Sequence, residues 1–124
     1  MENLKFDYLY RDGSNYKNRS AVVFSNPDKL SPSTVALELR QAFLPDGLFI
    51  AHQISLSEVF LYGEGDPTSD DHCFHEFDSV ELTAEAPDDP YGRSMSEFVA
   101  EVVKASQEGW RAFDPQDRVA GPKS

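Results

Sequence analysis

The densest group of side chains able to do chemistry lies in one short run, from Asp70 to Glu76, with the sequence Asp-Asp-His-Cys-Phe-His-Glu. Divalent metals bind imidazole, thiolate and carboxylate groups at close range, and this run offers ligands of each kind. His72 and His75 are three residues apart, and side chains at that spacing point to opposite faces of an extended strand. They can share one ion only if His72 lies in a loop that turns back. The metal-site candidates are therefore His72, His75 and Glu76, with Asp70 or Asp71 as a further ligand.

Cys73 and His75 could in principle form a nucleophile and base pair. A reactive cysteine needs a thiolate stabilised by nearby positive charge, and the surrounding carboxylates disfavour one. The chain also has no glycine-rich phosphate loop, no serine nucleophile elbow and no dinucleotide-binding fingerprint. The sequence therefore favours a protein that is not an enzyme and uses no cofactor. The alternative is a small metal-binding protein or metal-dependent enzyme centred on the two histidines and Glu76.

A second group of candidate ligands lies in the loop from Arg11 to Arg19, the one cationic patch of the sequence. Tyr16, Lys17 and Arg19 could bind a ring, because aromatic and cationic side chains together stack on bases in single-strand binders. A short loop set against a net charge of −11 is a poor match for nucleic acid. The alternative is an ordinary hairpin loop with a solvated rim.

Charge is distributed unevenly along the 124 residues. Residues 1–57 are neutral overall, so the formal net charge of −11 lies entirely in residues 58–124. The segment from Glu58 to Asp89 contains eleven carboxylates and neither lysine nor arginine. Such a surface repels phosphate backbones and anionic lipid headgroups, and it speeds encounters with a basic protein. The alternative is that the excess charge only keeps the protein soluble.

We therefore expect an acidic protein-binding module that docks on a basic partner, of the inhibitor, immunity or antitoxin kind or a nucleic-acid mimic. An aromatic anchor would supplement charge complementarity, since large rings dominate the energetics of many interfaces. Direct contact with nucleic acid or membrane is not expected, and the sequence leaves the oligomeric state open. The residues assigned to this docking face are Glu58, Phe60, Tyr62, Glu64, Asp66, Asp70, Asp71, Asp88, Asp89 and Tyr91.

Alternation of apolar and polar residues predicts a β-hairpin at the start of the chain. Residues 4–10 alternate with a period of two, as in a strand with one buried face. Residues 21–24 are interpreted as the returning strand, after a polar loop at 12–18.

Two helices are predicted from their start signals. Ser31 is placed to cap a helix with Pro32 at its first position, and an apolar stripe at helical period runs through residues 35–43. Ser94 and Glu97 form a capping box before a second stripe over residues 95–103. Gly109 suits the end of that helix, and Trp110 could fold back as its apolar partner.

The strands between the helices are harder to predict. Residues 48–50 and 59–62 are short apolar runs, which we interpret as two short strands or as one strand and an irregular segment. Residues 72–82 predict a further strand, central or partly covered. Strict alternation places Phe74, Val80 and Leu82 on one side of it and His75 and Phe77 on the other.

The order of these elements predicts an α+β fold: an antiparallel or mixed sheet of four to five strands with two helices on one face. We expect one domain over residues 1–110 and a mobile tail at 111–124. The single cysteine, Cys73, excludes an intramolecular disulfide. The N-terminal residues lack the pattern of a signal peptide and no apolar run could span a bilayer, so we expect a cytoplasmic protein.

Three blocks of the sequence, at residues 6–18, 23–27 and 75–81, resemble a family of short uncharacterised bacterial proteins. These blocks contain Tyr-Leu-Tyr-Arg-Asp-Gly-Ser-Asn-Tyr-Lys-Asn, Phe-Ser-Asn-Pro and His-Glu-Phe-Asp-Ser-Val-Glu. The resemblance spans residues 4–103 and implies no activity, cofactor or residue role. It implies that the Tyr16 loop and the strand with His75 and Glu76 belong to a surface shared by the family, and it agrees with a cytoplasmic location.

Overall fold

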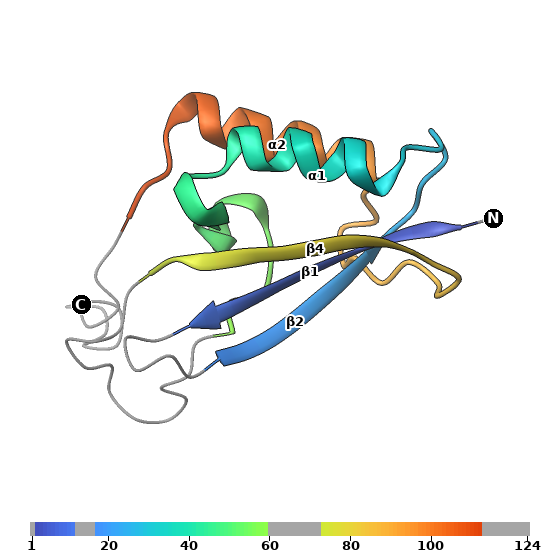
Figure 1. Ribbon diagram of the computed structural model, residues 1–124, viewed down its shortest axis with the longest axis horizontal. Helices are drawn as coiled ribbons and strands as arrows, with labels where there is room; N and C mark the ends of the chain where they lie inside the picture. The colour runs from blue at the N-terminus through green and yellow to red at the C-terminus, as the bar shows by residue number, and fades with distance from the viewer. Residues whose placement is uncertain (1, 12–16, 60–72, 113–124) are drawn as a thin grey trace.

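The computed structural model describes residues 2–11, 17–59 and 73–112. They form a four-stranded antiparallel sheet, in the order β2-β1-β4-β3, with both helices on one side of it (Figure 1). This confirms the predicted α+β fold. The elements are β1 (Asn3–Arg11), β2 (Lys17–Phe24), α1 (Pro32–Ala42), η1 (Pro45–Gly47), β3 (Leu48–Phe49), η2 (Ala51–Ile54), β4 (His75–Thr83) and α2 (Met95–Glu108).

Both helices begin where their sequence signals predict. The Ser31 side chain accepts a hydrogen bond from the Thr34 N–H at the start of α1. Ser94 and Glu97 form the complete capping box at the start of α2. Such caps satisfy N–H groups that have no partner within the helix. Neither these helices nor the two short 3-10 turns in the described ranges is long and apolar enough to cross a membrane.

β2 and β3 differ from the prediction in extent. β2 begins at Lys17 rather than at residue 21, so the hairpin is longer than its apolar residues indicate. β3 has two residues, and the chain from Ser55 to Val59 is irregular, which matches the interpretation of one strand and an irregular segment. Residues 60–62 and the tail from residue 113 lie outside the described residues.

A β-bulge in β4 decides which side chains face the helices. Phe77 pairs with Tyr8 of β1, and Ser79 pairs with the neighbouring Asp7. Asp78 is therefore an extra residue in β4. The extra residue brings Val80 onto the same face as Phe77. The prediction that placed Val80 and Leu82 opposite His75 and Phe77 was therefore wrong, because it assumed unbroken alternation through residue 78.

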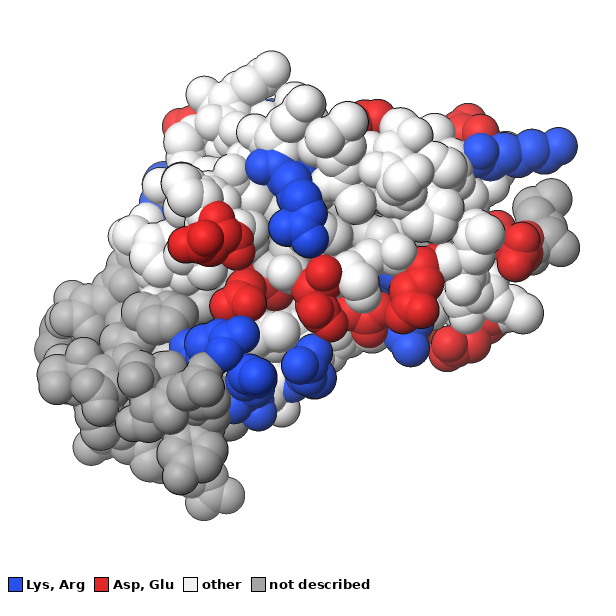
Figure 2. All heavy atoms as spheres, in the orientation of Figure 1, with Lys and Arg blue, Asp and Glu red and all other residues white. Residues whose placement is uncertain are grey.

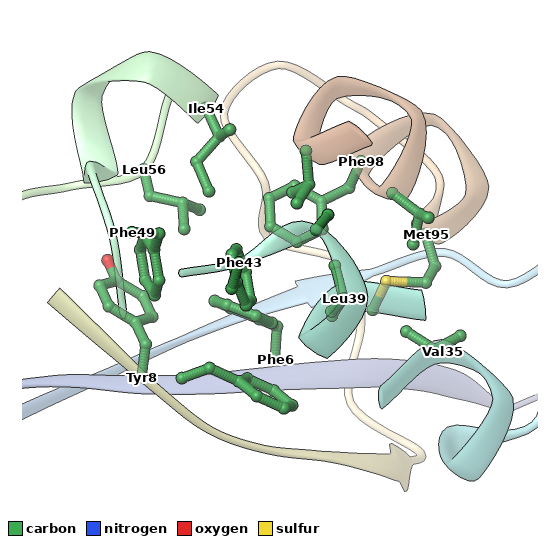
Figure 3. Packing of buried hydrophobic residues seen from close by; sticks show 14 of the residues in the cluster. Phe6, Tyr8, Val35, Leu39, Phe43, Phe49, Ile54, Leu56, Met95 and Phe98 are labelled. Atoms are coloured by element: carbon green, nitrogen blue, oxygen red, sulfur yellow. The ribbon is translucent and has the colours of Figure 1, made fainter. Parts of the chain in front are cut away.

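The core lies between the helix-covered face of the sheet and the two helices (Figure 3). Aromatic rings fill its centre, and Phe6 contacts Phe77 and Phe98 at centroid distances of 5.5 and 5.0 Å. Trp110 closes one end, since its ring packs against Phe43 and its Nε1 donates to the Ala42 carbonyl at 3.0 Å. This core packs against one face of the sheet, and no helix or strand of the described residues covers the other face (Figure 1).

Candidate functional site

Most acidic residues in the described part of segment 58–89 contact bases from elsewhere in the chain. The first two strands supply lysine and arginine side chains that the linear segment lacks, and the turn η2 supplies a histidine. These contacts are Arg11–Glu76 at 3.2 Å, Arg19–Asp78 at 3.0 Å, Lys5–Glu85 at 3.9 Å and His52–Glu58 at 3.4 Å. Glu64, Asp66, Asp70 and Asp71 lie outside the described residues, as do Phe60 and Tyr62, so docking of a basic partner there stays a prediction.

The face of the sheet away from the helices carries both signs of charge. Leu9 of β1 lies directly between Arg19 of β2 and Glu76 of β4, and it is only 2% exposed. Arg19 crosses β1 to reach Asp78 on β4. Figure 2 shows acidic side chains in a row beside a group of basic ones on this side of the molecule. The described part of this face is therefore a mixed surface with a covered leucine, and not an acidic one.

The two aspartates at the end of the acidic segment bond within the protein. The Asp88 N–H donates to the Val23 carbonyl at 3.0 Å, and Asp88 Oδ1 accepts from the Val23 N–H at 2.7 Å. The Asp89 side chain is 1% exposed and accepts from Nε and Nη2 of Arg93, each at 3.0 Å. Asp89 therefore presents no carboxylate to a partner, whereas the side chain of Tyr91 is well exposed.

Arg93 joins this loop to the turn η2. Its Nη1 donates to the Ile54 carbonyl at 2.8 Å and its Nη2 to the Ser55 carbonyl at 3.1 Å. Burial alone would raise the pKa of Asp89, but the hydrogen bonds and charge of Arg93 outweigh burial and lower that pKa below its usual value of 3.8. The ion pair is therefore charged at neutral pH and fixes the loop against η2.

The histidine strand does not bring its two described ligand candidates together. His75 is fully buried on the helix-covered face, and its Nε2 accepts a hydrogen bond from the Val59 N–H at 2.9 Å. Glu76 lies on the opposite face and bonds Arg11. Within residues 2–11, 17–59 and 73–112 there is no cluster of three His, Cys, Asp or Glu side chains able to hold a metal. His72 lies outside these ranges, so a site that includes it stays a prediction.

β2 forms one edge of the sheet, and the register shows which of its main-chain groups point outward. Val23 bonds outward to Asp88, and residues of one strand alternate between its two sides. Lys17, Arg19 and Ala21 therefore also direct their N–H and C=O groups outward, while the residues between them bond β1. No strand of the described residues pairs with this edge. Of the loop-ligand candidates, Lys17 and Arg19 lie on this edge, and Tyr16 lies outside the described residues.

A pocket of about 280 Å³ adjoins this edge. Val22 of β2 lines it on one side, and the chain from η2 to Ser57 and the loop at Asp89–Tyr91 form the other walls. The buried Arg93 ion pair holds those two walls together, since it bonds both. The residues that line the pocket are Val22, His52, Ser55, Leu56, Ser57, Asp89, Pro90 and Tyr91.

A second hollow, of about 410 Å³, lies where α1 begins. It is mainly apolar, and Leu82 at the end of β4 contributes a side chain that is 46% exposed. Leu30 and Pro32 form the opposite wall. Unlike the first pocket, it does not lie beside outward main-chain groups of β2.

Sequence reasoning missed both Arg93 and the edge of β2. Arg93 is the only lysine or arginine between Arg40 and Lys104, which was a usable signal that it pairs with a nearby carboxylate. The edge could not be found from the alternation pattern, because strand order depends on pairing that is distant in sequence.

Comparisons of this chain with protein-family models, with curated proteins and with solved structures found no match. Function is therefore inferred from the chain's own geometry.

Proposed function

We propose that this protein is a non-enzymatic binding module that takes an extended segment of a partner protein onto the outer edge of β2. The observation that carries the proposal is the row of outward N–H and C=O groups at Lys17, Arg19 and Ala21, next to a pocket. In strand addition, main-chain hydrogen bonds provide affinity and pockets for alternate side chains provide specificity.

The edge is held rigidly, which favours docking of an extended segment. β2 pairs with β1 along its whole length, from Lys17 to Phe24. At one end Asp88 already occupies the outward groups of Val23, so a docking segment would pair with residues 17–21. A preformed edge loses little entropy on binding, and this improves affinity.

The pocket supplies a place for one side chain of the docked segment. Val22 points to the helix-covered side of the sheet and lines the pocket. In a segment paired with Ala21, the residue opposite Val22 would therefore direct its side chain to the pocket. Leu56 and the exposed Tyr91 give that side chain apolar contacts. An aromatic side chain at the rim of such a pocket is a common energetic centre of protein interfaces.

The charges on the edge disfavour pairing of two copies of this chain through β2. Antiparallel pairing about residue 18 would place Lys17 and Arg19 of one copy opposite the same residues of the other. Like charges directly opposite each other are destabilising, and lysine on an edge is a common protection against self-association. The favoured occupant is therefore a different protein.

Selection from a library of displayed random peptides tests this proposal, with an edge variant as the discriminating measurement. Ala21→Pro removes one outward N–H, and proline is tolerated on edge strands where its missing N–H faces solvent. Ala21→Val retains that N–H and is the matched control. We expect peptides selected on the wild-type protein to bind Ala21→Val normally and to lose about tenfold or more in affinity for Ala21→Pro, since each lost hydrogen bond costs about 1 kcal/mol and the ring obstructs its neighbours.

Two results would contradict the proposal. One is a selection that enriches no peptide above background. The other is a set of selected peptides whose affinity is the same for Ala21→Pro and wild type, provided that both proteins give the same circular dichroism spectrum.

A further inference from the structure

We infer that the segment taken up by the β2 edge is acidic, with carboxylate side chains at alternate positions opposite Lys17 and Arg19 and an apolar side chain next to them for the pocket. This inference rests on the proposed function and adds the chemistry of the partner to it. It names one occupant, an extended acidic segment of another protein.

Register places both basic side chains where a docked strand would meet them. Lys17 and Arg19 are two residues apart in β2, so both point to the face of the sheet away from the helices. Side chains directly opposite each other on neighbouring strands have Cβ atoms about 5 Å apart. A docked strand would therefore place alternate residues within reach of Lys17 and Arg19.

The two bases differ in how strongly they are already engaged. Arg19 bonds Asp78 at 3.0 Å, yet its side chain is still 59% exposed. Lys17 is exposed, and the described residues give it no ion pair. No carboxylate of the described residues therefore engages the charge of Lys17, and Arg19 can accept a second carboxylate while retaining Asp78.

The opposite side of the docked strand faces a less charged surface. Asn18 and Ser20 alternate with the two bases, and Val22 leads into the pocket beside Leu56. A strand with carboxylates on one side and small or apolar residues on the other would fit both surfaces of this edge. A basic strand would instead oppose Lys17 and Arg19 with like charge.

The net charge of −11 does not reverse this preference at contact distance. At physiological ionic strength, charges further apart than about 8 Å are largely screened, so the nearest side chains decide which strand is preferred. Long-range repulsion slows the encounter with an acidic segment without changing which residues it meets.

Paired synthetic peptides test the inference. One peptide alternates glutamate and threonine, with one leucine in place of a threonine, and its control has lysine at every glutamate position. Affinities are measured by fluorescence anisotropy for the wild type, for Lys17→Glu, for Lys17→Glu/Arg19→Glu and for Ala21→Pro. Lys17→Glu is the milder variant, since no ion pair of the described residues is lost with it.

We expect the wild-type protein to bind the acidic peptide about tenfold more tightly than the basic one, because each opposed pair favours opposite charges and disfavours like charges. The preference should shrink in Lys17→Glu and reverse in the double variant, and Ala21→Pro should weaken binding of either peptide. Equal or tighter binding of the basic peptide to the wild type would overturn the inference.

The outcomes also separate this inference from the proposed function. If display-selected peptides bind and Ala21→Pro weakens them, but the acidic peptide does not bind, then the charge inference is wrong and strand docking stands. If the acidic peptide binds with an affinity that Ala21→Pro leaves unchanged, the charge inference is overturned, since that peptide does not use the edge. The proposed function is overturned as well only if the display-selected peptides are equally insensitive to Ala21→Pro.

Discussion

Replacement of Arg93 by methionine should destabilise the protein more than any other arginine replacement in the described residues. The substitution keeps an unbranched side chain of similar length and removes the guanidinium that joins the loop at Asp89 to η2. Arg93 is 8% exposed and Asp89 is 1% exposed, so the carboxylate left behind would be buried without its counter-ion. The carbonyls of Ile54 and Ser55 would lose their donors as well.

The expected loss is about 3 to 5 kcal/mol in the free energy of unfolding. Breaking a buried ion pair by removing one partner typically costs about that much, because the other charge stays buried. Glu101, whose side chain is 42% exposed, loses only a solvent-screened contact and adds little. Small domains have free energies of unfolding of roughly 5 to 15 kcal/mol, so about a fifth or more of the stability is at stake.

Equilibrium unfolding in urea measures this loss, with the fluorescence of Trp110 and far-ultraviolet circular dichroism as two independent signals. For an m-value of about 1.5 kcal/mol/M, a loss of about 3 kcal/mol lowers the midpoint by about 2 M. Arg111→Met, at an exposed arginine, is the matched control and should change stability by less than about 0.5 kcal/mol. A loss below about 1 kcal/mol for Arg93→Met would refute the role assigned to this ion pair.

Three further substitutions test other parts of the structure by the same unfolding assay. Asp89→Asn should destabilise the protein at neutral pH. The difference in stability from wild type should shrink as the pH falls below about 4, because the pKa of Asp89 is lowered in the fold and the carboxylate stabilises the protein only while it is charged. A difference that grows on acidification would contradict this. Asp7→Asn should raise the urea midpoint at neutral pH, since burial raises the pKa of Asp7 and its charged form is disfavoured in the folded state; an unchanged or lower midpoint would count against it. Leu9→Ala should cost about 2 kcal/mol or more, because Leu9 is 2% exposed although it lies on the open face of the sheet, and a loss near zero would show that this leucine is not well packed.

The helices and the fold class could be predicted from the sequence because their signals are local. A cap such as Ser31, or the box formed by Ser94 and Glu97, lies within one turn of the helix it starts. Apolar stripes of period 3.6 then identify the buried face without knowledge of the rest of the fold.

The phase of β4 could not be predicted, because the bulge depends on a different part of the chain. Asp78 is accommodated as an extra residue only through the pairing of β4 with β1, which lies some seventy residues earlier in the sequence. Alternation within one strand contains no information on that pairing. The sequence therefore predicted the strand and misassigned one half of its side chains.

The candidate site was only partly predictable, for a related reason. The segment 58–89 has neither lysine nor arginine, yet its Glu76 and Asp78 meet Arg11 and Arg19 of the first hairpin across the sheet. Lys17 and Arg19 were identified as possible ligands from their charge. Their position on an open edge follows from strand order, which the sequence does not state.

Amide hydrogen exchange along β2, followed by NMR with and without a display-selected peptide, tests the central claim most directly. In the free protein, the amides of Lys17, Arg19 and Ala21 should exchange fast, and those of Asn18, Ser20 and Val22 slowly, because only the latter bond β1. Bound peptide should slow the outward amides of residues 17, 19 and 21. Slow exchange of the outward amides in the free protein, or no change when the peptide binds, would contradict the account.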